Sequence, residues 1–323
     1  MTGRWNINRR KSFTALSQKI MKSLFTLTVW MAVVGIMLAT SCGASVESGN
    51  MLREKLEAAI SDVPGRVGIA VISPEGDTLT VNNSGDYQLM SVFKLHQALA
   101  VAHALDLQGV SLNTVIRVRR TEFDPDTWSP VLKEHPDSLL SLTMTEWLSY
   151  LLQQSDNNVS NMLFQRIASV AATYSFIRAS TGIKDFRLTV MEEQMHRDHS
   201  LADGNRSTPL ACASLIRKVF TDSLVSPAKQ EAICRILSEC RTGLDRIHVP
   251  LAGEPSVTLA HKTGSGFRTP QGILMAHNDV GYVTLPDGRA YALAVLVKDF
   301  DGSEAEASAV IAKVSAIVYE TYR

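Results

Sequence analysis

The sequence lacks an excess of charge of either sign, because its 32 lysine and arginine residues balance its 32 aspartate and glutamate residues. A protein that binds nucleic acid normally carries a basic surface, so nothing here indicates a nucleic-acid partner. Cysteine is scarce, with four residues, and no Cys/His spacing is typical of a zinc site, so we expect no metal. Internal repeats and low-complexity tracts are also absent. The 323 residues therefore suffice for one large domain or two interlocked lobes.

One hydrophobic run stands out, and it lies near the N-terminus. The uncharged run Leu24 to Ala39 follows a basic segment, within which Met21 is an alternative start. The run is shorter than the roughly 20 apolar residues that a membrane-spanning helix needs. We therefore predict an export signal, with an uncleaved anchor as the alternative.

Cys42 follows the small residues Thr40 and Ser41, where a lipoprotein signal has its acylated cysteine. Ala39 differs from the leucine that is usual three residues before that cysteine. We predict a signal peptide of the lipoprotein type over residues 1–42 and a polar linker over residues 43–50. The protein would then be periplasmic and anchored to the membrane by a lipid on Cys42; a plain cleaved signal is the alternative.

The other three cysteines are Cys212, Cys234 and Cys240. At most one disulfide can form among them, and one thiol then stays free. Cys234 and Cys240 lie in a segment with a helical pattern, where they would serve as core residues.

The hydrophobic periodicity changes along the chain. Helical spacing marks residues 51–60, and alternation around the turn at 74–76 predicts a hairpin. The pattern is mainly helical from about residue 90 to 240, with helices starting near Thr143 or Thr145 and at Thr208-Pro209. Four strands (257–261, 272–276, 280–285 and 291–297) and an amphipathic helix (304–322) follow. This order predicts an α/β (α+β) fold, an antiparallel sheet flanked by N- and C-terminal helices, with an all-helical lobe inserted at about 90–240.

Ser91 and Lys94 stand at the start of a long apolar segment. Apolar residues from Val92 to Leu105 recur at helical spacing, which puts Ser91 and Lys94 on one face of a buried helix. A serine hydroxyl is a weak nucleophile until a neighbour accepts its proton. A lysine in an apolar setting can do so, because desolvation disfavours its charged form. The free N–H groups at a helix start can also stabilise an oxyanion. By itself, however, Ser-x-x-Lys is also an ordinary helix start.

Three further segments carry polar side chains that could act together with Ser91 and Lys94. Ser155-Asp156-Asn157 ends a helical pattern, where a simple loop is the plain interpretation. Lys262-Thr263-Gly264-Ser265 lies on a strand, where an edge lysine is common. Glu192 and Glu193 lie in the polar stretch 191–206, which has little secondary-structure signal; so long a loop is usually functional or disordered.

In this order and spacing, the four segments resemble those of class A serine β-lactamases and penicillin-binding proteins. The resemblance to a class A β-lactamase extends over residues 51–323. It implies hydrolysis of β-lactam antibiotics through a serine acyl-enzyme, by a monomer without metal or organic cofactor.

The resemblance also implies roles in the reaction. Ser91 attacks the lactam carbonyl, Lys94 assists proton transfer, and Glu192 activates the water that hydrolyses the acyl-enzyme. Ser155 relays a proton to the leaving nitrogen, and the backbone N–H groups of Ser91 and Ser265 form the oxyanion hole.

Other residues would bind the substrate. Lys262, Thr263 and Ser265 hold its carboxylate, and Arg246 supplies a second cation. Asn157 holds the side-chain amide, and Trp128 lines the rim of the cleft.

The loop around Glu192 departs from the common class A pattern. That pattern has an asparagine four residues after the glutamate, a binding position that His196 takes here. Its usual salt bridge cannot form, because Val190 and Asn205 stand at the two positions. These features are similar to the divergent cephalosporinase or extended-spectrum branch, so we expect cephalosporins to be preferred. Thr208-Pro209 falls where the loop should end, which favours Glu192 over Glu193 as the base.

Two alternatives remain at this stage. A D,D-peptidase would carry the same serine and lysines but normally lacks the loop glutamate. A β-lactam-binding sensor would be acylated without turnover, and it normally follows a long membrane-spanning region.

Overall fold

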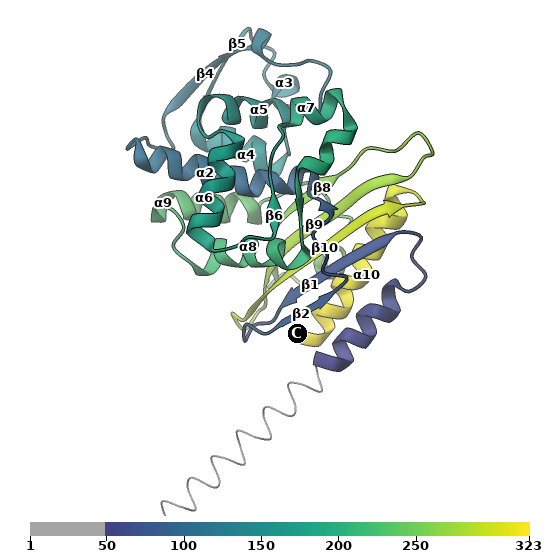
Figure 1. Cartoon of the computed structure of the whole chain (residues 1–323). Helices are drawn as coiled ribbons and strands as arrows, with labels where there is room; N and C mark the ends of the chain where they lie inside the picture. The colour runs from purple at the N-terminus through teal and green to yellow at the C-terminus, as the bar shows by residue number, and fades with distance from the viewer. Residues whose placement is uncertain (1–48) are drawn as a thin grey trace, which may run out of the picture. The chain divides into compact units, whose positions relative to one another are not determined.

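The computed structural model describes residues 49–323 (Figure 1). The predicted signal peptide, Cys42 and most of the predicted linker lie outside the described residues. Residues 49 and 50, the end of that linker, already belong to a helix that runs to residue 60. In the part of the chain that is described, no helix combines the length and hydropathy of a membrane span.

A five-stranded sheet forms one layer of the molecule. All its neighbouring strands are antiparallel, in the order β2-β1-β10-β9-β8. The first two strands come from the N-terminal part of the chain and the other three from the C-terminal part, so distant segments complete one sheet. The strands are β1 (Arg66–Ile72), β2 (Thr78–Val81), β8 (Thr258–Ser265), β9 (Leu274–Thr284) and β10 (Ala290–Phe300).

Each face of this sheet is covered by helices. On one face, Leu56 of the first helix and Val314 of α10 (Glu304–Tyr322) share a fully buried core with the sheet. Ser303 caps the start of α10, and its side chain forms a capping box with Glu306. On the other face α8 (Pro209–Thr221) packs along β1, β9 and β10 (Figure 1). Because both faces are covered, the central strands β1 and β10 are nearly continuous apolar runs.

A mainly helical lobe is inserted between β2 and β8. Its central helix, α2 (Phe93–Leu107), is buried on nearly all sides from Phe93 to Ala102. Helix α4 (Met144–Gln153) starts after Thr143, whose side chain caps it, and its residues Trp147, Leu148, Leu151 and Leu152 are fully buried. The other helices are α3 (Pro130–Glu134), α4 (Met144–Gln153), α5 (Asn157–Arg166), α6 (Val170–Thr181), α7 (Glu192–Arg197) and α9 (Pro227–Ser238), with 3-10 turns η1 (Met90–Val92), η2 (Arg120–Glu122), η3 (His199–Gly204) and η4 (Val249–Leu251).

The predicted architecture, a sheet built from both chain ends with an inserted lobe, is confirmed. The lobe is not purely helical as predicted, however. It contains the pair β4 (Val115–Arg119) and β5 (Leu139–Thr143), together with β6 (Phe186–Arg187) and β7 (Arg206–Ser207), which join β3 (Tyr87–Gln88). These strands are short and pair with distant partners, so local hydrophobic alternation gave little sign of them.

Three local predictions also change. The two strands expected over 272–276 and 280–285 are one continuous strand, β9. The stretch 191–206, expected to have little regular structure, contains α7 and η3. The three cysteines among residues 49–323, Cys212, Cys234 and Cys240, are all free thiols, and Cys240 lies beyond the end of α9 and not within a helix.

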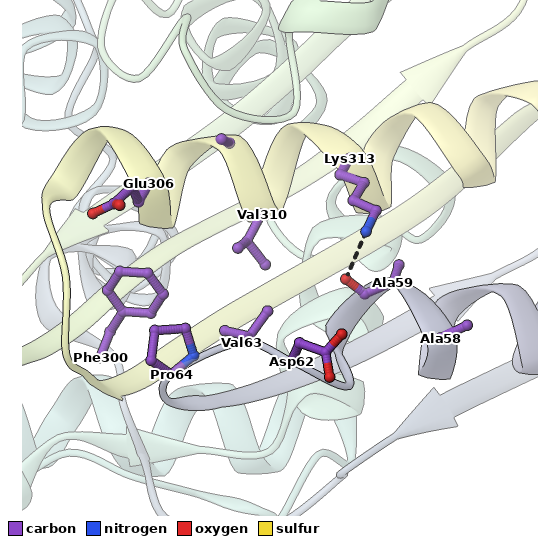
Figure 2. Close-up of a pocket in the computed structure, with 10 residues that line it drawn as sticks. Ala58, Ala59, Asp62, Val63, Pro64, Phe300, Glu306, Val310 and Lys313 are labelled. Carbon is purple, nitrogen blue, oxygen red and sulfur yellow. Dashed lines mark hydrogen bonds between the residues drawn. The ribbon is translucent and has the colours of Figure 1, made fainter.

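A cavity of about 350 Å³ opens between residues 58–64 and α10 (Figure 2). Val63, Pro64, Phe300 and Val310 form its apolar wall, and Lys313 Nζ donates to Ala59 O at 3.1 Å beside it. None of the predicted site residues lines this cavity.

Candidate active site

Ser91 lies in η1, directly before α2, with a half-buried side chain. Met90 before it has a φ of 45°, a left-handed conformation that is uncommon for a non-glycine residue and concentrates at functional sites. Gly264 of β8 passes so close that a Cβ there would lie 2.5 Å from Leu89 O and 3.2 Å from Ser91 N. Only glycine lets the strand approach the serine in this way.

Lys94 lies one turn after Ser91 and is fully buried. Its Nζ lies 3.1 Å from Ser91 Oγ and donates to Asn157 Oδ1 at 2.7 Å and Ser155 O at 2.8 Å. It also pairs with Glu192 Oε1 at 2.9 Å. The predicted proximity of Lys94 to Ser91 is thus present, and the amine joins two further segments of the site, Ser155–Asn157 and Glu192.

Glu192 is the first residue of α7 and its side chain is buried. Its Oε1 accepts a hydrogen bond from Ser91 Oγ at 3.2 Å. Glu193 points elsewhere, since its carboxylate pairs with the exposed Arg197 on the same helix. Of the two glutamates, only Glu192 therefore contacts the serine.

Ser155 connects the two lysines of the site. Its Oγ accepts from Lys262 Nζ at 3.1 Å and lies 3.4 Å from Lys94 Nζ. The residue has a φ of 57°, and Asp156 fixes the turn by accepting from Val159 N and Val131 N. Asp156 thus caps α5 as well as ending the preceding segment.

Lys262 is fully buried on β8 and donates to Ser155 Oγ and to Thr263 O. Burial lowers the pKa of Lys262 to about 7, because desolvation disfavours the ammonium, although the charge of Cys240 opposes this. Lys262 therefore titrates near neutral pH.

Arg246 and Ser265 complete this side of the site. Arg246 is buried, its Nη2 donates to Ser265 Oγ at 2.7 Å, and its Nη1 donates to Asn278 O at 2.6 Å. Ser265 is exposed, so the pair opens toward solvent. Arg246 thus lies beside the Lys262–Ser265 strand, and its role as a second cation for the substrate carboxylate stays a prediction.

Three residues, Asn157, Trp128 and His196, were predicted at the edge of the site, and their contacts differ. The Asn157 side chain contacts Lys94 and Thr127. Trp128 is 55% exposed and its indole donates to Gln154 O at 2.9 Å, which places it beside the Ser155 turn. His196 is half-buried on α7, and within residues 49–323 no hydrogen bond joins it to Ser91, Lys94 or Glu192. Its binding role stays a prediction.

Three asparagines support the site and were not found from the sequence. Asn161 Oδ1 accepts from Glu193 N, and Asn278 Nδ2 donates to Gln88 O and Leu89 O ahead of the nucleophile. Asn205 is fully buried; its Oδ1 accepts from Thr189 N and Val190 N, and its Nδ2 donates to Val190 O. These bonds close the base of the Glu192 loop where the usual salt bridge is missing. In the sequence, the one sign of this support was that Asn205 stands at a position of the usual salt bridge.

Among residues 49–323, no group of three or more His, Cys, Asp or Glu side chains is arranged to hold a metal ion.

The chain also resembles known proteins over most of its length. The model described as "Beta-lactamase enzyme family" matches residues 51–322. A β-lactamase of Phocaeicola vulgatus is 44% identical over 87% of this chain and 88% of its own length. The extended-spectrum β-lactamase PER-1 of Pseudomonas aeruginosa is 31% identical over 88% of this chain and 92% of its own. The crystal structure of a class A β-lactamase from Bacteroides cellulosilyticus DSM 14838 matches with a TM-score of 0.79 and 31% identity, covering 85% of this chain and 98% of that one.

A serine held between a buried lysine and a buried glutamate, in this fold, defines a serine hydrolase. The chain belongs to the β-lactamase enzyme family. It is a class A serine β-lactamase and hydrolyses β-lactams. The family and activity that the four motifs predicted are confirmed.

Proposed function

We propose that this enzyme hydrolyses β-lactams through an ester on Ser91, and that Glu192 is the general base that removes the ester. One observation carries the proposal: Glu192 Oε1 lies 3.2 Å from Ser91 Oγ and 2.9 Å from Lys94 Nζ. A general base must lie within hydrogen-bond reach of the group it serves, or one water away. The Glu192 carboxylate meets this condition, because it lies next to Ser91 Oγ, the oxygen that would carry the acyl group.

Acylation begins when Ser91 Oγ attacks the lactam carbonyl carbon. Two groups contact the hydroxyl and can accept its proton, Glu192 Oε1 and the neutral form of Lys94. The carbonyl oxygen gains negative charge, which the N–H groups of Ser91 and Ser265 would stabilise. The close approach of Gly264 to Ser91 N supports this assignment, because it brings the two backbones together.

Opening of the lactam ring requires a proton on the leaving nitrogen. Ser155 supplies it in this proposal, and its hydroxyl regains a proton from Lys262 or Lys94, which lie 3.1 and 3.4 Å from Oγ. The substrate carboxylate binds Lys262, Thr263 and Ser265. Arg246, 2.7 Å from Ser265 Oγ, adds a second positive charge next to that hydroxyl. Asn157 and Trp128 would contact the substrate side chain at the opposite rim.

The nucleophile is tested with Ser91→Ala, which removes the attacking oxygen and leaves α2 intact. Purified wild-type protein should turn over a chromogenic cephalosporin many times, whereas the variant should give neither turnover nor a covalent adduct in the intact mass. An adduct on the variant would refute Ser91 as the nucleophile. A single stoichiometric burst by the wild type would indicate a D,D-peptidase or a sensor instead.

The substrate preference is also a proposal. Asn205 holds the Glu192 loop by hydrogen bonds to its backbone in place of the usual salt bridge, and Ser265 is exposed beside Arg246; both features can accommodate the larger side chains of cephalosporins. We expect a higher kcat/KM for oxyimino-cephalosporins than for benzylpenicillin. The opposite order on pure enzyme would refute this.

The cellular location is proposed from the sequence alone. Residues 1–42 would direct export to the periplasm and Cys42 would carry a lipid, and the enzyme would act as a monomer. The signal peptide and Cys42 lie outside the described residues, and the monomeric state is an expectation from the family resemblance.

A further inference from the structure

Two buried serines on α10 hold the segment that carries Arg246 (residues 245–247). Ser308 is 3% exposed and Ser315 is fully buried. They lie about two helical turns apart, so their side chains are on the same face of the helix. Ser308 Oγ donates to Asp245 Oδ2 at 2.5 Å, and Ser315 Oγ donates to Ile247 O at 2.8 Å. The two hydrogen bonds therefore reach the residues directly before and after Arg246.

The buried side of α10 is otherwise mainly apolar, and Ile311 and Val314 on it are fully buried in the sheet core. A buried hydroxyl costs free energy unless it is hydrogen-bonded. On a helix it commonly bonds a carbonyl of the preceding turn, as Thr321 of α10 does. Ser308 and Ser315 instead donate to residues outside the helix. These two hydroxyls thus tie α10 to residues 245–247.

His277 of β9 fixes the direction of the Ser308 hydroxyl. Burial lowers the pKa of His277 to about 4, so its ring is neutral at pH 7, and its Nε2 lies 2.8 Å from Ser308 Oγ. Burial would raise the pKa of Asp245, but the hydrogen bond from Ser308 and the charge of Arg246 lower it, so the acceptor is an ionised carboxylate. The single hydroxyl proton goes to this carboxylate, and Nε2 of His277 is therefore the donor to Oγ.

Arg246 extends from this segment to the strand that would bind the substrate carboxylate. Its Nη1 donates to Asn278 O at 2.6 Å, and its Nη2 donates to Ser265 Oγ at 2.7 Å. Both contacts require that the Arg246 backbone lies at the right distance from β8 and β9. Besides the two serines, Asp279 Oδ2 of β9 accepts from Ile247 N at 3.2 Å. The backbone of the segment is therefore held from α10 and from the sheet.

We propose that Ser308 and Ser315 are positioning residues for Arg246. Their hydrogen bonds fix the backbone from which the guanidinium reaches the substrate carboxylate. The effect on substrate binding rests on the proposed role of Arg246 as the second cation for that carboxylate. Without the Ser308 hydroxyl, Asp245 loses its anchor and the His277 N–H loses its acceptor, so the segment can shift. A displacement of about 1 Å can lower a rate about 10²-fold, and one of the two anchors remains, so we expect a loss of about 3–10-fold in kcat/KM.

The experiment measures the steady-state kinetics of purified full-length protein with a chromogenic cephalosporin that bears the usual carboxylate, and with its methyl ester. Ser308→Ala removes the anchor on α10. Asp245→Ala removes the same hydrogen bond from a side chain that is 62% exposed, so a folding defect of the first variant does not decide the test. Each should lower kcat/KM for the acid about 3–10-fold and leave the ester unaffected. The loss should appear mainly as a higher KM, because the carboxylate is bound in the ground state as well as in the transition state.

A double-mutant cycle tests whether the serines act through Arg246. In an Arg246→Ala background, neither Ser308→Ala nor Asp245→Ala should cause a further loss. Ser315→Ala tests the second anchor and should show the same pattern. Thr321→Ala is the matched control on α10, because its hydroxyl bonds only within the helix, and it should behave like the wild type.

Wild-type kinetics of both Ser308→Ala and Asp245→Ala with the acid would overturn the positioning role. Equal losses with the acid and its ester would overturn it as well, because they indicate a general structural defect and not a displaced cation. A full further loss in the Arg246→Ala background would do the same, since the serine would then act independently of Arg246. If Arg246→Ala itself keeps the wild-type kcat/KM for the acid, the proposed role of Arg246 fails, and the positioning role with it. A loss in Arg246→Ala without a loss in the other two variants refutes the positioning role alone.

Discussion

Replacing Glu192 by glutamine should separate the two halves of the reaction. Glutamine keeps the shape of the side chain but cannot accept a proton, so water that attacks the ester on Ser91 loses its base. The base that the substitution removes is Glu192 Oε1, which lies 3.2 Å from Ser91 Oγ. General-base assistance contributes about 10²–10⁴-fold to a rate, and deacylation should slow by that factor.

Acylation should fall much less, because Lys94 offers a second route for the serine proton. In the wild type the fully buried Lys94 is paired with Glu192 at 2.9 Å. Lys94 Nζ lies 3.1 Å from Ser91 Oγ, and this contact does not depend on the Glu192 carboxylate. The ester should therefore form and accumulate.

The assay mixes the variant with a chromogenic cephalosporin. The expected result is a burst of one product per enzyme, a steady rate about 10²–10⁴-fold below the wild type, and an intact mass raised by the acyl group. Glu193→Gln is the matched control, since Glu193 pairs with Arg197 and should turn over like the wild type. If Glu193→Gln traps the ester and Glu192→Gln does not, the base is the neighbouring residue. If neither variant traps it, the base lies outside this loop and the reasoning fails.

Three further predictions concern pH, stability and anchoring. Because burial lowers the pKa of Lys262 to about 7, its charged form is present below that pH and is lost above it, so kcat/KM should fall as the pH rises through about 7. Lys262→Arg, which stays charged, should remove this alkaline limb; an unchanged limb would point to another group. Asn205→Ala leaves Thr189 N and Val190 N without their acceptor, and each such loss costs about 1–3 kcal/mol, so denaturant unfolding should show a clear loss of stability. A fully stable variant would show that Asn205 does not hold the loop. Metabolic labelling with a fatty acid should tag the wild type but not Cys42→Ser, and an untagged wild type would favour a plain cleaved signal.

Local features of the chain were readable from the sequence. Ser91 and Lys94 meet because residues three apart on a helix share a face. Thr143 caps α4 because Thr143 and Glu146, three residues later, form the two halves of a capping box. The hairpins follow from turn residues between alternating strands. In each case the partners are close in the chain, so the pattern alone defines the contact. The roles of Glu192 and Lys262 came from the resemblance to a family rather than from their surroundings.

Contacts between distant segments were decided only by the tertiary structure. Asn205 looked like the loss of a salt bridge, and its own side chain closes the same loop with three backbone hydrogen bonds. Cys240 was expected to be a core residue of a helix; it is buried, but it lies beyond the end of α9, where its sulfur is 3.4 Å from Thr242 Oγ1. His261 and Asp279 are 18 residues apart in the chain and meet at 3.0 Å from neighbouring strands, and no local period relates them. Burial and neighbouring charge set the state of these groups, and both are properties of the packed molecule that a sequence pattern does not encode.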